Sequence, residues 1–310
     1  MSVPLSFGAA CWGQYTTWPE LLDAALAVDR LGYASLWSTD HLQAIHGTSP
    51  GPIFEGWSTL AAWAAVTKRV RLGLMVGANT FREPGLVAKL ATTLDHISGG
   101  RAILGLGAAS NEAEHRAFGI PFGSSPAERL RWLDEALAIL RSSLDGEARP
   151  APGPRYRAAE PWTRPAPIQA RLPILVGGGG ERMTLLLVAR WADMNNVGGA
   201  IDVVRRKEAA LIGHCEALGR DPDEIERTAG IGIVVIRQRQ EAASRAYAAI
   251  LERNGSARIP AQTVGTPASV AEHLAPYAEL GYRHLIAEFP APHDLESIER
   301  LVVEVGPMLG

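Results

Sequence analysis

The segment Ser35-Leu36-Trp37-Ser38-Thr39-Asp40-His41 joins a short apolar run to a carboxylate and an imidazole. We expect the run to form a buried strand whose end presents Asp40 and His41 side by side. A second informative segment is the glycine run Gly177 to Gly180, which lies between an apolar run and a helical pattern. Together the two segments predict a place for proton chemistry and a place for a phosphate on one face of one fold.

Strand-like and helix-like segments alternate along the whole chain. Strands are expected at residues 5–11, 33–39, 70–77, 101–107, 173–176, 192–197, 229–236 and 284–287. Helices are expected at residues 18–31, 57–66, 84–97, 127–140, 181–189, 201–218, 240–254, 270–280 and 295–309. This order predicts the α/β class and a (β/α)8 TIM barrel with inserted loop segments, as a single domain over residues 1–310. A doubly wound sheet is the rival fold, because strand counting alone does not exclude it.

The regular alternation breaks between residues 145 and 171, where the chain holds six prolines. Little hydrophobic periodicity is present in this stretch. We expect an excursion from the barrel or a lid over it.

Composition narrows the class of protein. The chain has a net charge of −3, which leaves no broad basic face for nucleic acid or an anionic membrane. Its two cysteines, Cys11 and Cys215, support no disulfide framework and fit a reducing cytoplasm. The histidines are scattered without ligand spacing, so no metal is expected. No signal peptide or membrane span is expected either.

A barrel holds its active site at the carboxyl ends of its strands, and this rule ranks the polar residues. His41 is the sharpest candidate, as a proton donor or a hydrogen-bond donor to a bound ring. The plainer alternative is a rim histidine bonded to a backbone carbonyl. We expect Asp40 to orient another group rather than to perform chemistry. Polar residues also follow the other strands, namely Asn79, Thr80, Ser110, Asn111, Glu112, Glu114, Asn195 and Asn196.

The glycine run Gly177-Gly178-Gly179-Gly180 lets backbone approach a ligand closely, and free amides at a helix start favour anions. A phosphate site is the functional interpretation, and a tight strand-to-helix turn is the structural one. Neither this run nor the segment Gly105 to Ser110 completes the dinucleotide pattern, so a Rossmann NAD site is poorly supported.

Aromatic residues gather near the early strand ends. A pocket above a flat cofactor is one interpretation, and barrel-capping core is the other. Glu55 could bind a polar substrate group or face water. The aromatic residues concerned are Trp12, Tyr15, Phe54, Trp57 and Phe81.

Six ordered segments carry a resemblance to a known family. They are residues 31–41, 71–84, 94–101, 104–122, 174–182 and 265–267, and they include Asn79-Thr80-Phe81-Arg82-Glu83-Pro84, Leu94-Asp95-His96-Ile97-Ser98-Gly99-Gly100-Arg101 and Asn111-Glu112-Ala113-Glu114. In these segments the chain resembles the bacterial-luciferase-like family of flavin and deazaflavin enzymes, and within it the F420-dependent oxidoreductases. The resemblance spans essentially the whole chain.

The resemblance implies a barrel with an added segment near its seventh strand, usually a dimer, and a non-covalently held deazaflavin or FMN. It implies a non-proline cis peptide at Met75-Val76 that presses on the flat ring. It aligns His41 with the family's active-site histidine and Asp40 with its partner acid. The cofactor residues it implies are Met75, Val76, Gly77, Asn79, Gly107, Ser110, Asn111, Gly177, Gly178, Gly179 and Gly180. We expect Trp12, Glu55 and Trp57 in the substrate pocket.

Two departures from the family concern the substrate. The family often carries tryptophan where Ser110 stands, and Asp-Ala-Trp-Asn where this chain has Asp193-Met194-Asn195-Asn196. Both changes replace a large ring with a smaller side chain.

The sequence thus predicts a cytoplasmic F420-dependent oxidoreductase that transfers a hydride between coenzyme F420 and a small organic substrate. Its partners are expected to be that small molecule and a second copy of the chain, with His41 and Asp40 as catalytic residues. The alternatives are an FMNH2-dependent luciferase-like monooxygenase and a catalytically inactive cofactor-binding barrel.

Overall fold

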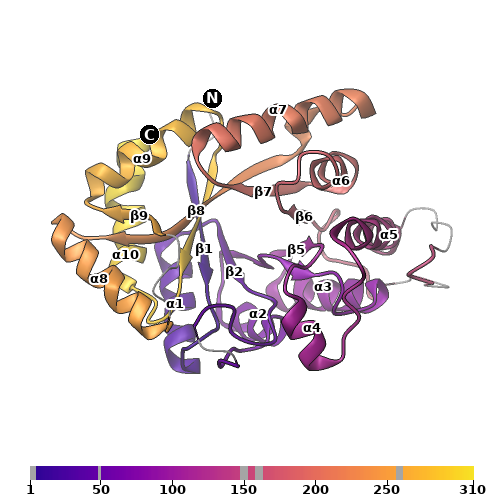
Figure 1. The fold of residues 1–310 in the computed structure, drawn as a ribbon, viewed down its shortest axis with the longest axis horizontal. Helices are drawn as coiled ribbons and strands as arrows, with labels where there is room; N and C mark the ends of the chain where they lie inside the picture. The colour runs from indigo at the N-terminus through magenta and orange to yellow at the C-terminus, as the bar shows by residue number, and fades with distance from the viewer. Residues whose placement is uncertain (1–4, 48–49, 147–152, 158–162, 256–260) are drawn as a thin grey trace.

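The structure is a computed structural model that describes residues 5–47, 50–146, 153–157, 163–255 and 261–310. Within these ranges, eight parallel strands form a closed ring with helices outside it (Figure 1). In ring order they are β1 (Ser6–Cys11), β2 (Ser35–Ser38), β3 (Arg71–Leu74), β5 (Ala102–Gly107), β6 (Ile174–Gly177), β7 (Met194–Gly198), β8 (Glu226–Ile236) and β10 (His284–Phe289). The predicted barrel is confirmed.

The last strand closes the ring. β10 pairs with β1 from Ser6–His284 to Cys11–Phe289, and on its other side it pairs with β8. Because every strand of the ring has two neighbours, the doubly wound sheet is wrong.

Two short strands lie outside the ring. β4 (Gly77–Ala78) pairs with β5 just beyond β3. β9 (Ala261–Gly265) runs parallel to the second half of β8 and was not expected from the sequence. It lies between β8 and β10 in the chain, where the family resemblance places an added segment.

The expected helices are present, but η1 at residues 222–224 was not expected, and the expected closing helix at residues 295–309 is divided into three pieces. The helices are α1 (Trp18–Leu31), α2 (Gly56–Val66), α3 (Pro84–Ser98), α4 (Glu112–Phe118), α5 (Pro126–Asp145), α6 (Thr184–Trp191), α7 (Ile201–Leu218), η1 (Pro222–Glu224), α8 (Gln240–Arg253), α9 (Pro267–Glu279), α10 (Leu295–Arg300), the π-helical turn η2 (Leu301–Val305) and α11 (Gly306–Leu309). α4 was not expected, and α6 starts at Thr184 rather than directly after the glycine run.

Local sequence signals account for the helix ends. Thr17 and Glu20 form a capping box at the start of α1, which satisfies two backbone amides. Gly32 ends the same helix in the left-handed conformation, with φ of 81°. Ser125 caps α5, and Pro126 begins it.

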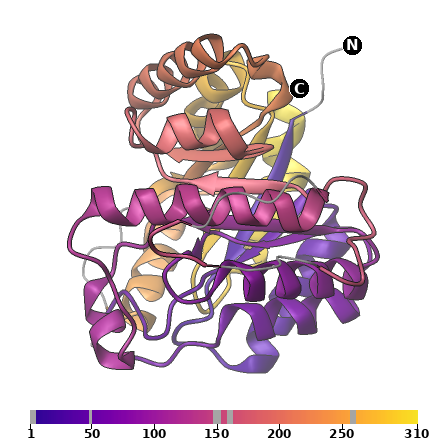
Figure 2. The same ribbon diagram turned by 90° about the vertical axis from the view of Figure 1, so that its right-hand side faces the viewer.

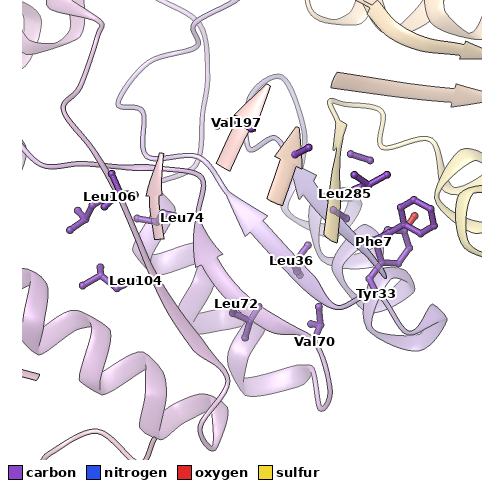
Figure 3. Packing of buried hydrophobic residues seen from close by; sticks show 14 of the residues in the cluster. Phe7, Tyr33, Leu36, Val70, Leu72, Leu74, Leu104, Leu106, Val197 and Leu285 are labelled. Atoms are coloured by element: carbon purple, nitrogen blue, oxygen red, sulfur yellow. The ribbon is translucent and has the colours of Figure 1, made fainter. Parts of the chain in front are cut away.

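Side chains alternate across the barrel wall, because successive residues of a strand point to opposite faces. Leu36 points outward into the shell between strands and helices, as do side chains from the neighbouring strands (Figure 3). Trp37 points inward. The interior cluster at this level consists of Ala10, Trp37, Ile103, Leu175, Met194 and Ile286.

Polar side chains fill the amino end of the barrel. Arg71 pairs with Glu226 at 2.7 Å, and Glu226 pairs with Nδ1 of His284 at 2.7 Å. Nε2 of His284 lies 2.8 Å from Oγ of Ser35, which accepts from the Trp37 indole at 2.7 Å. This chain of contacts lies at the amino end, opposite the end at which a barrel holds its active site.

The irregular segment after α5 is described in part. Backbone amides of Ile168 and Gln169 donate to Asp95 of α3 at 2.7 and 3.1 Å. Tyr156 is buried beside α5, which crosses this side of the barrel in Figure 2. The described residues are thus held to the outside of the barrel, and a lid role stays a prediction.

Candidate active site

A cavity of about 410 Å³ opens at the carboxyl end of the barrel. Its walls come from the ends of β2, β3, β5 and β6, from β4, and from the first turns of α4, α5 and α6. They consist of Asp40, His41, residues 75–78, residues 107–110, Glu114, Pro126, Arg129, Leu130, Gly177, Gly178 and Thr184. This volume is typical of small-molecule sites.

The chain between β3 and β4 forms a bulge with a cis peptide bond at Met75-Val76. The implied non-proline cis peptide is therefore present. A Cβ placed on Gly177 would lie 2.5 Å from Cγ1 of Val76, and one on Gly107 would lie 2.7 Å from Cγ2. Glycine at these two strand ends therefore makes room for the bulge and leaves bare backbone beside it.

His41 stands at the rim of this cavity with its side chain one quarter exposed. Nδ1 lies 3.0 Å from Oε1 of Glu114, whose side chain is buried and also accepts from the amide of Leu42 at 3.0 Å. A carboxylate at Nδ1 fixes the ring and leaves Nε2 for a ligand. His41 thus has an acid partner, and that partner is on α4.

Asp40 does not hold His41, contrary to the sequence-based expectation. Its carboxylate accepts two bonds from Arg82, at 2.8 and 3.0 Å, and one from the amide of Ala78 at 2.9 Å. Burial raises the pKa of Asp40, and the neighbouring Arg82 opposes that effect. Successive side chains at a strand end point in different directions, so adjacency in sequence does not give contact. Asp40 instead ties the loop after β2 to β4.

The first two glycines of the run differ in position from the last two. Gly177 and Gly178 line the cavity, and Gly178 has a φ of 110° that favours glycine. A Cβ on Gly179 would meet the side chain of Lys207, and one on Gly180 would meet Thr184. A turn over residues 181–183 separates the run from α6.

Arg129 is a cavity residue that sequence reasoning missed. Its Nε donates to the carbonyl of Ala109 at 3.3 Å, and its guanidinium carbon lies 3.8 Å from the centre of the Phe122 ring. Among the described residues, no carboxylate pairs with it. A buried guanidinium without an acid partner suits an anionic ligand group. The residues present therefore fit a flat ring beside the bulge and a phosphate-bearing tail near Arg129, Ser110 and Thr184.

Comparison with known proteins identifies the family. The model of the luciferase-like monooxygenases matches residues 1–284. The chain belongs to the luciferase-like monooxygenase family.

Relatives of this luciferase-like protein include several dehydrogenases. An F420-dependent glucose-6-phosphate dehydrogenase of Microbacterium testaceum (strain StLB037) is 28% identical over 334 aligned positions, which cover 98% of this chain and 97% of that protein. Two solved structures show the same fold. An F420-dependent secondary alcohol dehydrogenase with an F420-acetone adduct has a TM-score of 0.81 at 16% identity, covering 99% of this chain and 100% of that one. A riboflavin lyase with modified FMN and riboflavin has a TM-score of 0.79 at 17% identity, covering 99% and 91%.

Several residues predicted for the site lie outside this cavity of the luciferase-like barrel. Asn79 is buried and exchanges hydrogen bonds of 3.1 Å with the hydroxyl of Tyr156. Asn111 caps α4 through the amide of Ala113. These two residues shape the walls from behind. The side-chain nitrogen of Asn79 and the side-chain oxygen of Asn111 are thus engaged by protein groups.

The three residues predicted for the substrate pocket also lie outside the first cavity. Glu55 caps α2 through the amides of Trp57 and Ser58, and it pairs with Arg82 at 2.8 Å. Trp57 is buried in the shell between strands and helices. Trp12 stacks on the ring of His46 and lines a second cavity at the barrel mouth. Arg82, with two acid partners, is not available to a cofactor tail.

No group of three or more His, Cys, Asp or Glu side chains in the described ranges has a geometry that could hold a metal ion. In the same ranges, every helix is too short or too polar to cross a membrane.

Proposed function

We propose that this protein is an F420-dependent oxidoreductase that transfers a hydride between coenzyme F420 and a small organic substrate. One observation carries the proposal. A single cavity has the bulge Met75-Val76 and bare glycine backbone on one side and His41 at its rim. On another side it has Arg129, which no carboxylate of the described residues pairs with. The full-length relatives named F420-dependent glucose-6-phosphate dehydrogenase support the choice of cofactor.

The residues of the cavity divide by chemistry. Met75, Val76 and Gly77 present a wall for a flat ring, and Gly107 with Gly177 lets that wall project inward. When bound, F420 supplies a carbon that accepts or donates the hydride. The cavity holds cofactor and substrate at reacting distance, which is a large part of such catalysis.

The tail of the cofactor is anionic, and one side of the cavity suits it. Arg129 offers guanidinium donors, Ser110 and Thr184 offer hydroxyls, and Gly178 offers close backbone approach. In this proposal, Gly179, Gly180 and Asn111 support the surface from behind and do not contact the tail.

His41 would give or take the proton that accompanies hydride transfer. Glu114 holds Nδ1 at 3.0 Å, so Nε2 is the atom that exchanges the proton. Asp40 contributes by fixing the loop that carries His41. Its hydrogen bonds to Arg82 and Ala78 leave it no direct part in the proton transfer.

An FMNH2-dependent monooxygenase is the second candidate. The family description and the structural likeness to a riboflavin lyase with modified FMN favour it. Titration of the purified protein with F420 and with FMN, followed by tryptophan fluorescence, separates the two candidates. Tighter binding of F420 supports the proposal, and tighter binding of FMN favours the monooxygenase. Binding of neither cofactor would overturn both.

Two further features belong to the proposal. We place the protein in the cytoplasm, because Cys11 and Cys215 are both free and buried. We also propose a homodimer, on the resemblance to the family, and light scattering of the purified protein at several concentrations tests this.

A further inference from the structure

A second cavity of about 360 Å³ lies at the same end of the barrel, beside β1, β7, the middle of β8 and β10. Trp12, His46, Asn196, Tyr277 and Glu288 line it, together with glycine-rich backbone at residues 198–199 and 230–232. His41 and His46 belong to one loop after β2, and each lines one of the two cavities. Both cavities therefore border the loop that carries His41.

Glu288 is directed into the barrel by the alternation of β10. His284 belongs to the polar chain at the amino end, and Ile286 belongs to the interior cluster in the middle. Glu288 is two residues further on, so its side chain points inward at the carboxyl end. It pairs in register with Ala10, another interior residue.

The carboxylate of Glu288 has no hydrogen-bond or ion-pair partner among the described residues. Burial alone raises its pKa. The side chain of Glu288 is partly exposed in the cavity, so a cation bound there would meet an acid without a competing partner among the described residues.

None of the described side chains that line this cavity pairs with Glu288. The one basic side chain in its lining is His46, and burial lowers the pKa of that imidazole, as does nearby His41. Lys207 donates to the carbonyl of Gly198 at 3.1 Å, and its ammonium group lies against Gly179 in the run that borders the first cavity. The hydroxyl of Tyr277 donates a hydrogen bond to the carbonyl of Gly199 at 2.8 Å.

Aromatic rings form part of the remaining wall. The ring of Trp12 stacks on His46, with centres 5.0 Å apart and planes 11° apart, and it belongs to the apolar cluster with Ile233 and Val235. The glycine-rich backbone beside these rings leaves room for a compact polar molecule.

We propose that the second cavity is the substrate pocket and that the substrate carries a protonated amine or quaternary ammonium group, which pairs with Glu288. The assignment as substrate pocket rests on the proposed function. An anionic substrate such as glucose 6-phosphate would meet a carboxylate here instead of a free cation, so this chain differs in substrate class from the relatives named for that sugar.

The test compares cations with neutral molecules of the same shape. Choline is paired with 3,3-dimethylbutan-1-ol, and benzylamine with benzyl alcohol. Binding to the intact protein is measured by calorimetry and by tryptophan fluorescence. The variants are Glu288→Gln and, as a matched control, Glu252→Gln on the exposed face of α8.

We expect at least one cation to bind about 10-fold or more tightly than its neutral partner, the scale of a close charge pair. Glu288→Gln should remove that preference and leave binding of the neutral molecules unchanged, while Glu252→Gln should change nothing. Equal affinity within both pairs, absence of binding, an unchanged preference in Glu288→Gln, or tighter binding of glucose 6-phosphate would overturn the proposal.

Titration of F420 into the same proteins distinguishes the two proposals. If wild type and Glu288→Gln both bind F420 normally but neither prefers cations, the cation proposal alone is defeated. A cation preference that depends on Glu288 in a protein that refuses F420 defeats the proposed function and leaves the cation site in place.

Discussion

Nδ1 of His41 lies 3.0 Å from the buried carboxylate of Glu114, across 73 residues of sequence. The acid adjacent in sequence, Asp40, is turned away and engaged by Arg82. The imidazole is therefore held from α4, and its free edge is at the rim of the cavity.

Replacement of His41 by alanine should lower turnover about 100-fold or more, the usual scale for a lost general acid–base. Affinity for F420 should stay within a few-fold, because His41 lies at the rim. The rate of F420 reduction is followed by absorbance under single-turnover conditions. An unchanged rate would remove the proton role from His41.

Glu114→Gln is the companion variant for His41. The amide keeps the hydrogen bond to Nδ1 but no longer balances a positive imidazolium. The pH profile of the rate should therefore move. A loss of equal size at every pH would instead indicate a purely structural role for Glu114.

Gly177→Ala tests the bulge. The added Cβ would lie 2.5 Å from Cγ1 of Val76, so the wall beside the cofactor must shift. Overpacking of this kind typically costs about 1–3 kcal/mol, and we expect F420 binding to weaken about 10-fold. Gly85→Ala in α3 is the matched control, because a Cβ there meets nothing within 4 Å. Equal F420 affinity in the two variants would contradict this account of the bulge.

Arg129→Gln should weaken F420 binding about 10-fold, since a charge-assisted contact to the anionic tail is lost. Salt should weaken binding to the wild type more than to the variant. Arg131→Gln, an exposed residue of the same helix, serves as control. If the two variants bind F420 alike at low salt, the tail lies elsewhere.

His293 makes stability depend on pH. Burial lowers its pKa to about 4, from an ordinary value of 6.5. The folded state keeps the imidazole neutral, while the unfolded chain takes up a proton below pH 6.5. Stability is therefore lost as pH falls from 6.5 towards 4, by about 1.4 kcal/mol per unit of the pKa difference.

Urea unfolding of wild type and His293→Gln between pH 7 and pH 4 measures this dependence. The variant should show a flatter change of unfolding free energy over that range. His273→Gln, at an exposed position of α9, should keep the wild-type slope. Identical slopes in wild type and His293→Gln would show that another group is responsible.

The sequence predicted the strands and helices of the barrel better than the elements added to it, β9 and α4. Strand and helix patterns are local, and the ring of strands follows their order. β9 was missed because Ala261–Gly265 is short and partly polar, and its pairing with β8 is not local. α4 was missed although Asn111 is a regular helix cap, which is a usable signal.

The site was predicted in part. His41 and the strand-end glycines Gly107, Gly177 and Gly178 do line the cavity. Arg129 could not be singled out, because one arginine on a charged helix looks like any other until the helix is placed. Trp57 looked like a pocket residue because buried core and pocket walls use the same aromatic side chains.

A crystal structure of the protein with bound F420 tests the central claim most directly. We predict that the deazaflavin ring lies against Met75 and Val76 and that its reactive carbon is on the side of His41. The phosphate-bearing tail should lie within hydrogen-bond reach of Arg129 and Gly178. A ring bound elsewhere, or a tail that leaves Arg129 without a contact, would contradict it.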